Sequence, residues 1–535
     1  MADADNVEMD PNIDYEIGQD NIQTHIGPFG LDIHNPVFFV SGLGIVAFVL
    51  GALMFPEGST TLFGAMRDWL THNFDWFFIL SGNIFVAFGI LLIITPLGSV
   101  RLGGKDATPD YTYTGWFAML FAAGMGIGLM FFGVSEPISH FSSSIAADAG
   151  SPDSWAPLGG APGDPEAAAR LGMAATIYHW GLHPWAMYAV VALALAFFSY
   201  NRGLPLSIRS AFYPIFGDRV WGTLGNVIDT VAVFATLFGL ATSLGFGADQ
   251  ATAGLNFLFG IPQTDVVKVV LILGITGVAL VSVMAGLDAG VKRASEINMV
   301  LAFILLVFVL FVGPTVAIIT GFFSSLGSYA SNFAALSMPF GREDANYSQG
   351  WTAFYWAWWI SWSPFVGMFI ARVSRGRTVR EFMVCVLLIP SMVCVLWMSV
   401  FGGTAIHQVV VDGYTGVTDA ATELRLFTML EALPLHTITS FIGIILVIVF
   451  FVTSSDSGSL VIDTITAGGK TDGPLPQRVF WCVFEGLVAI TLLLGGGLAA
   501  LQAMAVATGF PFAILLLLMC VSVFIGLRQE RREKG

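Results

Sequence analysis

The chain of 535 residues is 56% hydrophobic and only 11% charged, with a mean hydropathy of +0.78. An ordinary soluble domain carries about 25% charged residues, so this composition excludes a soluble globular protein. The net charge of −15 excludes a basic surface for nucleic acid, and we expect no nucleic-acid partner. Four cysteines lie within apolar runs without metal-ligand spacing, which predicts buried thiols. They are Cys385, Cys394, Cys482 and Cys520.

Residues 1–36 form an acidic segment with eight carboxylates and no Lys or Arg. A signal peptide needs a positively charged region before its apolar core, so this segment does not match one. Its high charge and low hydrophobicity predict a solvated, disordered cytoplasmic tail. At the other end, residues 527–535 form a short basic tail, which we also expect in the cytoplasm.

Twelve apolar runs follow the acidic segment, each long enough to cross the hydrocarbon core of a bilayer as a helix. They fall at residues 37–55, 76–98, 114–139, 174–198, 222–258, 266–286, 297–320, 351–371, 382–405, 437–462, 479–497 and 502–526. The runs are apolar on most sides, whereas the strands of a membrane barrel alternate apolar and polar residues. We therefore predict an all-α integral membrane protein with twelve transmembrane helices.

Basic residues are distributed unevenly between the two sides that these spans define. With the N-terminus placed inside, seventeen of the 22 Lys and Arg residues fall on the inside and five on the outside. The five are Arg67, Arg170, Lys268, Arg342 and Arg425. Because cationic loops tend to stay cytoplasmic, we predict a multi-pass protein of the inner (plasma) membrane with both termini in the cytoplasm.

The third run contains a glycine cluster over residues 124–128, followed by Glu136 and Pro137. Irregular backbone at membrane depth is tolerated only where it lines a cavity or is buried in protein. The cluster therefore predicts either a helix break at a cavity or close packing of helices through small residues. No strand precedes it, so it is not a dinucleotide-binding fingerprint.

The fourth run places three aromatic rings, Trp180, Trp185 and Tyr188, beside His179 and His183. Trp is commonest at membrane interfaces, but three rings in the middle of a run also suit a quaternary ammonium group. Each ring contributes about 0.5–2 kcal/mol to such a group by cation–π attraction. The two histidines are open to two interpretations, as packed hydrogen-bonded side chains or as proton carriers.

Prolines predict interruptions in two runs, at Pro184 in the fourth and at Pro364 in the eighth, where Ser361 and Ser363 lie nearby. The third and eighth runs, both interrupted, are then the first helices of two halves of five. A five-helix unit repeated in tandem enters the membrane in opposite senses, as in transporters with inverted repeats. We predict repeats over residues 114–320 and 351–526, preceded by two further helices over 37–98.

The tenth run ends in a polar stretch, residues 453–459, with five hydroxyls and one carboxylate. Such groups are costly at membrane depth unless they have partners. Hydroxyls that bond back to their own helix are one interpretation. We favour the other, in which this stretch binds an alkali cation together with carbonyls at the glycine-rich break. No nearby histidine or nucleophile turn supports serine-hydrolase chemistry.

With these motifs the chain resembles the betaine/choline/carnitine transporter family over essentially all twelve spans. The resemblance rests on the glycine cluster with Glu136-Pro137 and on residues 179–188, 356–377 and 453–458. Its most specific marker is the tryptophan-rich eighth span. The resemblance implies a LeuT-like core of two inverted five-helix repeats in spans 3 to 12 and assembly as a homotrimer.

The resemblance also implies a substrate site. An aromatic box would enclose a trimethylammonium group, and the substrate carboxylate would lie by the backbone of the glycine cluster. A further tryptophan would line the substrate path. The implied substrate-binding residues are Trp180, Trp185, Tyr188, Trp359, Trp362, Gly124, Gly126, Gly128 and Ser243.

Two sodium sites are implied in the same way. The main site would use the carbonyls of Ala122, Met125 and Phe450 with the hydroxyls of Thr453 and Ser454. A second site is matched only in part, because leucine occupies the position of one of its two threonines. Its matching residues are Thr236 and Phe365, and the leucine is Leu240.

Gly128 bears on the charge of the substrate. Similar choline transporters carry aspartate at this position, where a fixed carboxylate balances the charge of choline. Glycine leaves room for a substrate that brings its own carboxylate, so we expect a zwitterion. On this interpretation Gly128→Asp would admit choline.

We therefore expect a secondary active symporter that imports a zwitterionic compatible solute, glycine betaine above all, by alternating access. Sodium is expected as the coupling ion, with no other cofactor. The alternative is a transporter of choline, dimethylsulfoniopropionate or ectoine, coupled to protons or sodium. No feature favours a channel or a membrane-bound enzyme, and we expect no enzymatic activity.

Overall fold

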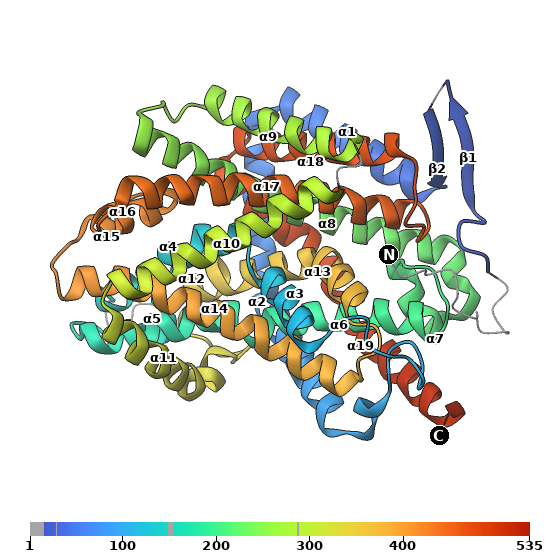
Figure 1. The fold of residues 1–535 in the computed structure, drawn as a ribbon, viewed down its shortest axis with the longest axis horizontal. Coiled ribbons are helices and arrows are strands. Elements are labelled where there is room, and N and C mark those ends of the chain that lie inside the picture. Colours follow the sequence, from blue (N-terminus) through green and yellow to red (C-terminus); the bar gives the residue numbers. More distant parts are fainter. Residues whose placement is uncertain (1–14, 28, 148–153, 286–287, 535) are drawn as a thin grey trace.

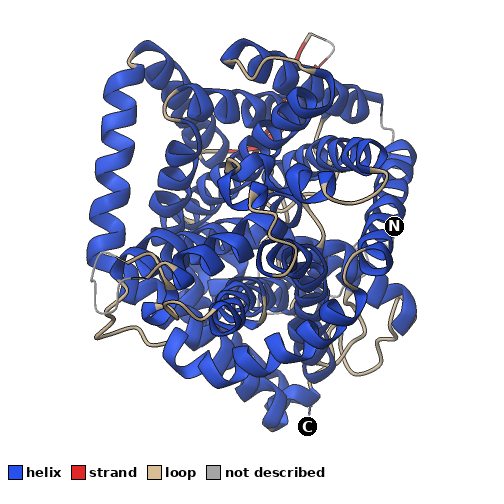
Figure 2. Cartoon of the chain, turned by 90° about the vertical axis from the view of Figure 1, so that its left-hand side faces the viewer, coloured by secondary structure: helices blue, strands red, loops and turns tan. Residues whose placement is uncertain are grey.

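The protein is a bundle of long helices with one short β-hairpin near its N-terminus (Figure 1, Figure 2). The computed structural model describes residues 15–534 apart from 28, 148–153 and 286–287. The strands are β1 (Asn21–Ile26) and β2 (Phe29–His34), paired antiparallel with Asn21 opposite His34. The helices are α1 (Val37–Met54), α2 (Pro56–Ile94), α3 (Tyr113–Gly124), α4 (Ile127–Ile145), α5 (Pro165–Trp180), α6 (Leu182–Tyr200), α7 (Tyr213–Phe216), α8 (Thr223–Phe259), α9 (Asp265–Ala285), α10 (Asp288–Val312), α11 (Thr315–Leu336), α12 (Ala345–Tyr347), α13 (Ala353–Val373), α14 (Val379–Val410), α15 (Gly416–Asp419), α16 (Arg425–Glu431), α17 (His436–Thr466), α18 (Leu475–Leu494) and α19 (Gly497–Lys534).

The helices follow the predicted runs, although the number of apolar spans differs from twelve. Among the described residues, ten helical segments are long and apolar enough to cross a membrane, and the bent pair α3 and α4 makes eleven. The remaining predicted span corresponds to α13, which is outside this set. Its Trp, Tyr, Ser and Pro residues lower its hydropathy, and most of them are buried in protein instead of facing lipid. The all-α membrane architecture is confirmed, and the crossing of α13 remains a prediction.

The interruption predicted at Pro364 is wrong, because α13 continues as one helix from Ala353 to Val373. Proline lacks an N–H, so the carbonyl four residues earlier, that of Ile360, loses its usual donor. The hydroxyl of Ser363 donates to this carbonyl at 2.6 Å. The freed carbonyl is therefore hydrogen-bonded within the helix. Irregular backbone lies instead just before α13, in a π-helical turn over Ser348–Thr352.

The break predicted in the third run is present, and the break in the fourth lies three residues earlier than predicted. Helices α3 and α4 meet at an angle of 62° across Met125 and Gly126. In the fourth run the chain breaks at Gly181, and Pro184 sits in the first turn of α6. Proline is tolerated there because the first N–H groups of a helix have no intrahelical partner.

The seventh run does not form one helix over residues 297–320. Helix α10 ends at Val312, and α11 begins at Thr315 after Pro314. The residue before a proline is disfavoured in helical conformation, so Gly313 and Pro314 divide a run that remains apolar throughout. Helix α11 then packs against α5 and α14.

Three loops with basic residues predicted for the inside, those around Arg101, Asn201 and Gly376, meet at one end of the bundle. The Arg101 guanidinium donates to the carbonyl of Gly376 at 2.6 Å, and the Asn201 amide donates to the carbonyl of Arg101 at 2.9 Å. Asn201 also bonds Glu530 near the end of α19. The hairpin lies at the same end (Figure 1). The last helix runs on to Lys534, so residues 527–534 continue it and do not form a separate tail.

The prediction of a disordered tail is wrong for the hairpin, whereas residues 1–14 lie outside the described residues. The Lys470 ammonium lies 2.6 Å from a carboxylate oxygen of Asp32. The Gln477 side chain exchanges two hydrogen bonds with the Asp32 backbone, both 3.1 Å long. The Asn21 amide donates to the carbonyl of Ala467 at 2.8 Å. Composition predicted solvation, but these partners follow more than 430 residues later in the chain.

Helix α13 occupies the middle of the bundle and packs against α6, α8, α19 and α2. Its aromatic side chains Tyr355, Trp356 and Trp358 are almost wholly buried. Helix α4 packs against α5, α14 and α8. The two broken spans are therefore held against α13 and its neighbours, where the candidate site lies.

Candidate functional site

A small cavity, with about 50 Å³ of space open to the centre of a water-sized sphere, lies where the broken spans meet α13. Its lining comes from the α3–α4 break, from α5 and α6, and from α8, α13 and α14. A mostly aromatic and apolar lining with a few polar groups is typical of small-molecule sites. All nine predicted substrate-binding residues line it, namely Gly124, Gly126, Gly128, Trp180, Trp185, Tyr188, Ser243, Trp359 and Trp362. Their role in binding remains a prediction.

The four residues of the predicted aromatic box form adjoining walls. The ring centroids of Trp180 and Trp359 are 4.8 Å apart with planes at 73°, and those of Tyr188 and Trp359 are 6.3 Å apart at 77°. Trp185 and Tyr188 are 5.1 Å apart at 76°. The planes of neighbouring rings are close to perpendicular, so the rings form the sides of a corner and are not stacked. A cation in this corner would face more than one ring and be attracted to each.

Hydrogen bonds hold two of these tryptophans in place. The Trp180 indole N–H donates to Oε2 of Glu136 at 2.6 Å, and the Trp359 indole N–H donates to the carbonyl of His179 at 2.9 Å. His179 is itself held, with Nδ1 2.6 Å from Oε1 of Glu136 and Nε2 2.9 Å from the hydroxyl of Thr352. Of the two interpretations of His179, the geometry favours a packed, hydrogen-bonded side chain.

The α3–α4 break presents free backbone to the cavity. Helix α4 begins at Ile127, and the N–H groups of its first turn have no partner within the helix. Gly126 has extended backbone, and a Cβ added to it would meet no atom within 4 Å. The N-terminus of a helix carries partial positive charge and favours anions. The cavity thus combines an aromatic corner for a cation with a helix start for an anion.

Some lining residues were not predicted from the sequence. Trp359, Trp362 and Val366 lie three and four positions apart, so their spacing on one face of α13 could have identified Val366. Trp358 also lines the cavity and donates its indole N–H to the hydroxyl of Ser243 at 3.2 Å. No sequence signal marks Cys394, which α14 brings in from the second half of the chain. The buried indole N–H of Trp362 has no hydrogen-bond partner.

The residues predicted for the main sodium site come from the α3–α4 break and from α17, and α4, which follows the break, contacts α17. Ala122 and Met125 lie at the α3–α4 break, and the carbonyl of Ala122 accepts a hydrogen bond from the N–H of Met125 at 3.2 Å. Phe450, Thr453 and Ser454 lie within α17. The Thr453 hydroxyl donates to the carbonyl of Val449 at 3.0 Å, which is the back-bonded arrangement of a helical threonine. A hydroxyl in this arrangement keeps a lone pair for a cation.

The residues matched to a second sodium site lie on α8 and α13, which also pack together. Thr236 is buried and donates to the carbonyl of Ala232 at 2.7 Å. Phe365 packs with Trp362 at a ring distance of 5.1 Å. Leu240 is fully buried, and its methyl carbon would lie 2.4 Å from a Cβ on Gly458. Leucine offers no oxygen, so this pair of helices contributes one hydroxyl fewer than the family pattern.

Comparison with known proteins decides the family. The family model described as "BCCT, betaine/carnitine/choline family transporter" matches residues 36–532. The chain belongs to this family of transporters. A glycine betaine/proline/choline transporter of Vibrio parahaemolyticus is 67% identical over 97% of this chain and 94% of its own length. A glycine betaine transporter of Bacillus subtilis is 43% identical over 93% of this chain and 95% of its own length.

Membership in the betaine/carnitine/choline family identifies the chain as a multi-pass membrane transporter of small solutes and not an enzyme. The resemblance deduced from the motifs is thereby confirmed. A second Vibrio parahaemolyticus relative, a glycine betaine transporter, is 53% identical over 97% of this chain and 98% of its own length. The match to these relatives runs almost from end to end, so it includes both broken spans and α13.

Proposed function

We propose that this transporter is a sodium-coupled symporter for glycine betaine and related quaternary ammonium solutes. The observation that carries the proposal is the cavity in which a corner of four aromatic rings faces the same space as the start of α4. The aromatic corner attracts the trimethylammonium group by cation–π interaction. The first N–H groups of α4 bind the carboxylate. The unpartnered indole N–H of Trp362 is a further donor for that carboxylate.

The proposed substrate range includes choline and proline as well as betaine, since the relative at 67% identity is a glycine betaine/proline/choline transporter. All three carry a positively charged nitrogen, and betaine and proline also carry a carboxylate. The aromatic corner recognises the shared cation, and the helix start serves the substrates that have an anion.

Sodium supplies the driving force in this proposal. A zwitterion has no net charge and gains nothing from the membrane potential, whereas each sodium ion gains about 2.3 kcal/mol per 100 mV. The carbonyls of Ala122, Met125 and Phe450 with the hydroxyls of Thr453 and Ser454 supply the hard oxygen ligands that an alkali ion prefers. Thr236 and Phe365 match only part of a second sodium site, because Leu240 replaces one of its threonines.

The proposed cycle is alternating access in a LeuT-like core of two inverted repeats, with α3 to α10 forming one repeat and α13 to α19 the other. The protein is proposed to act as a homotrimer in the inner (plasma) membrane, with the basic end of the bundle in the cytoplasm because cationic loops are retained there. Import of a compatible solute would serve osmotic protection.

Uptake into proteoliposomes tests the proposal. Purified protein is reconstituted, and radiolabelled betaine uptake is followed with an inward sodium gradient and with potassium in place of sodium at constant pH. The expected result is transient accumulation above the external concentration that requires sodium. Equal uptake in potassium would contradict sodium coupling, and equilibration without accumulation would indicate a channel.

A further inference from the structure

Glu136 is buried directly behind the aromatic wall of the cavity. The carboxylate is fully buried and belongs to α4, two turns after Gly128. Its oxygens receive hydrogen bonds from two rings of the site region, the Trp180 indole at 2.6 Å and the Tyr355 hydroxyl at 2.6 Å, both on Oε2. Trp180 therefore has one edge bonded to a carboxylate while the residue also lines the substrate cavity.

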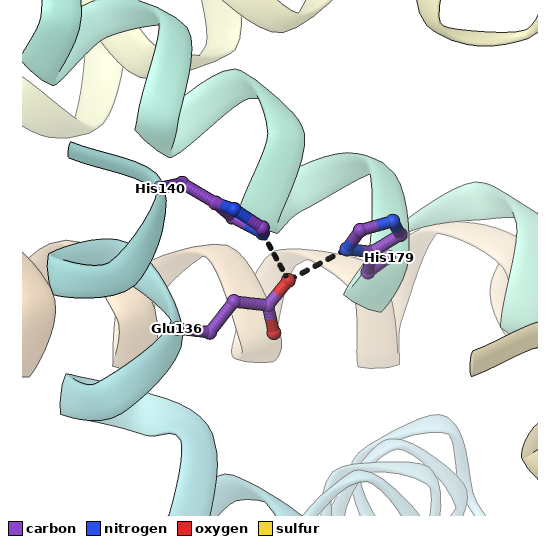
Figure 3. Close-up of side chains that lie close together, drawn as sticks. All are labelled: Glu136, His140 and His179. Atoms are coloured by element: carbon purple, nitrogen blue, oxygen red, sulfur yellow. Dashed lines mark hydrogen bonds and ion pairs between the residues drawn. The ribbon is translucent and has the colours of Figure 1, made fainter. Parts of the chain in front are cut away.

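Two histidines complete the contacts of this carboxylate (Figure 3). His140 Nε2 lies 3.1 Å and His179 Nδ1 2.6 Å from Oε1 of Glu136. The other nitrogen of His140 is buried without a partner, so a doubly protonated ring would bury an unpaired N–H, which is costly. His179 Nε2 lies 2.9 Å from the hydroxyl of Thr352, which can donate to it. We assign both rings as neutral donors to an ionised Glu136.

The cluster then carries a net negative charge with no compensating cation at hydrogen-bond distance. Among the described residues, the two histidines are the only basic groups that pair with Glu136. The nearby Arg342 is balanced by Asp344 at 2.7 Å. Arg425 reaches α4 through the carbonyl of Ser135 and the hydroxyl of Ser139. A buried charge held only by neutral dipoles acts over a longer range than a solvated one because water does not screen it.

The cavity lining itself contains no Asp, Glu, Lys or Arg. A cationic substrate without a carboxylate, such as choline, would find only ring faces there. We infer that Glu136 is a specificity-determining residue of the proposed substrate site, whose charge attracts the substrate cation through the Trp180 wall. The inference rests on the proposed function and adds to it the source of the negative potential that attracts the substrate cation. In this chain that source is Glu136, since position 128, where similar choline transporters carry aspartate, is glycine.

The carboxylate acts in two ways on Trp180. It fixes the ring orientation through the indole N–H, and its negative charge adds to the negative potential at the ring face. Its charge also acts directly on a cation bound against the Trp180 ring. Removing the charge while keeping the shape should weaken binding of a cation and leave binding of a neutral molecule of the same shape unchanged.

The test uses choline and its neutral isostere dimethylbutanol, in which carbon replaces the quaternary nitrogen. Binding of each to purified full-length protein is measured by tryptophan fluorescence and competition with labelled betaine. We expect Glu136→Gln to lower choline affinity by about tenfold, as for one unit charge at moderate effective dielectric constant. Affinity for dimethylbutanol should change less than twofold. An equal loss for both ligands would show a purely structural role and overturn the inference.

Tyr355→Phe is the matched control, because it removes one hydrogen bond from the same carboxylate oxygen and leaves the charge in place. The ratio of choline to dimethylbutanol affinity should stay at the wild-type value in this variant. A fall in the ratio with the charge intact would overturn the inference even if Glu136→Gln fails to fold. If wild-type protein binds neither choline nor betaine, it is the proposed function that fails.

A further experiment tests whether a metal ion binds to Glu136 and the two histidines. One ligand atom each from Glu136, His140 and His179 lies within 4.8 Å of the others, a spacing that a transition metal can bridge. A bound divalent metal would cancel the negative charge. We expect treatment with EDTA to leave the affinity ratio unchanged. A change in the ratio on chelation would assign the cluster to a metal and overturn the inference.

Discussion

Gly128 lies against the edge of Trp180, with no room for a side chain between them. A Cβ added to Gly128 would lie 2.8 Å from the Cη2 atom of Trp180 and 3.3 Å from that of Trp358. The Trp180 ring cannot easily move aside, because its indole N–H donates a hydrogen bond to the buried Glu136 at 2.6 Å. The glycine therefore makes room for the aromatic wall. This contact gives a reason for glycine that differs from the expected room for a substrate carboxylate, so we expect Gly128→Asp to disturb the aromatic wall.

The first prediction concerns this contact. Gly128→Asp and Gly128→Ala should both displace Trp180 and weaken betaine binding. Loss of one ring from the corner is worth about 0.5–2 kcal/mol, or roughly 2- to 30-fold in affinity. Binding is measured by isothermal titration of purified protein. Gly274→Ala in α9, where an added Cβ would meet no atom within 4 Å, is the control. Betaine affinity in Gly128→Asp and Gly128→Ala equal to that of the control would refute this explanation.

The second prediction concerns Trp359, which adjoins both Trp180 and Tyr188. Trp359→Leu should raise the half-saturating betaine concentration by roughly 2- to 30-fold, because one cation–π wall is lost. Trp359→Phe keeps a smaller ring and should fall between leucine and the wild type. The measurement is initial uptake rate against betaine concentration in proteoliposomes. Equal values for Leu and Phe would show that ring electrons do not matter at this position.

The third prediction tests the sodium ligands. Thr453→Val removes a hydroxyl and Ser454→Ala another, so each should raise the half-saturating sodium concentration for betaine uptake by about tenfold or more. The control is Thr439→Val, a threonine near the other end of α17 that also bonds back to its own helix. If the two site variants matched the control, the sodium ions would have to bind elsewhere.

The fourth prediction concerns His34 in β2, which lies outside the membrane-spanning helices. Burial, aided by the nearby Arg209 cation, lowers the pKa of His34 from 6.5 to about 4. A released hairpin takes up a proton below pH 6.5, whereas the docked hairpin does so only near pH 4. Docking is therefore strongest above pH 6.5 and weakens as the pH falls toward 4, by up to about 1.4 kcal/mol per unit.

Hydrogen exchange of the hairpin amides at pH 7 and pH 5, corrected for intrinsic rates, measures this effect. Protection should fall at pH 5 in the wild type. His34→Phe should remove the pH dependence, and His25→Phe, an exposed histidine of β1, should retain it. An unchanged pH dependence in His34→Phe would exclude this histidine as its source.

Local sequence patterns determined the helical architecture and much of the candidate site. Apolar runs predicted helices at almost every place where the structure has them, because covering about 30 Å of hydrocarbon requires a long apolar segment that satisfies its own backbone. The glycine cluster and the Trp-rich run predicted residues that line one cavity. The glycine cluster and the Trp-rich run each involve only neighbouring residues, so they can be recognised without knowledge of the tertiary structure.

Prolines and charge were less reliable guides, because their effect depends on neighbours. At Pro364 the hydroxyl of Ser363 satisfies the freed carbonyl, so the helix continues. In the acidic segment Asp32 pairs with Lys470, which follows 438 residues later. Neither outcome can be deduced from hydropathy or composition, since each rests on a specific hydrogen bond or ion pair.

The sequence alone determined that this is a helical membrane protein whose candidate substrate-binding residues are aromatic or uncharged, because period, length and residue type are local properties. Only the tertiary structure decided what fills the space around each residue. It placed Trp180 against Gly128 and Glu136 behind Trp180, through packing between α4, α5 and α13. Beside the aromatic wall, the interior thus holds a buried carboxylate with four hydrogen-bonded neighbours.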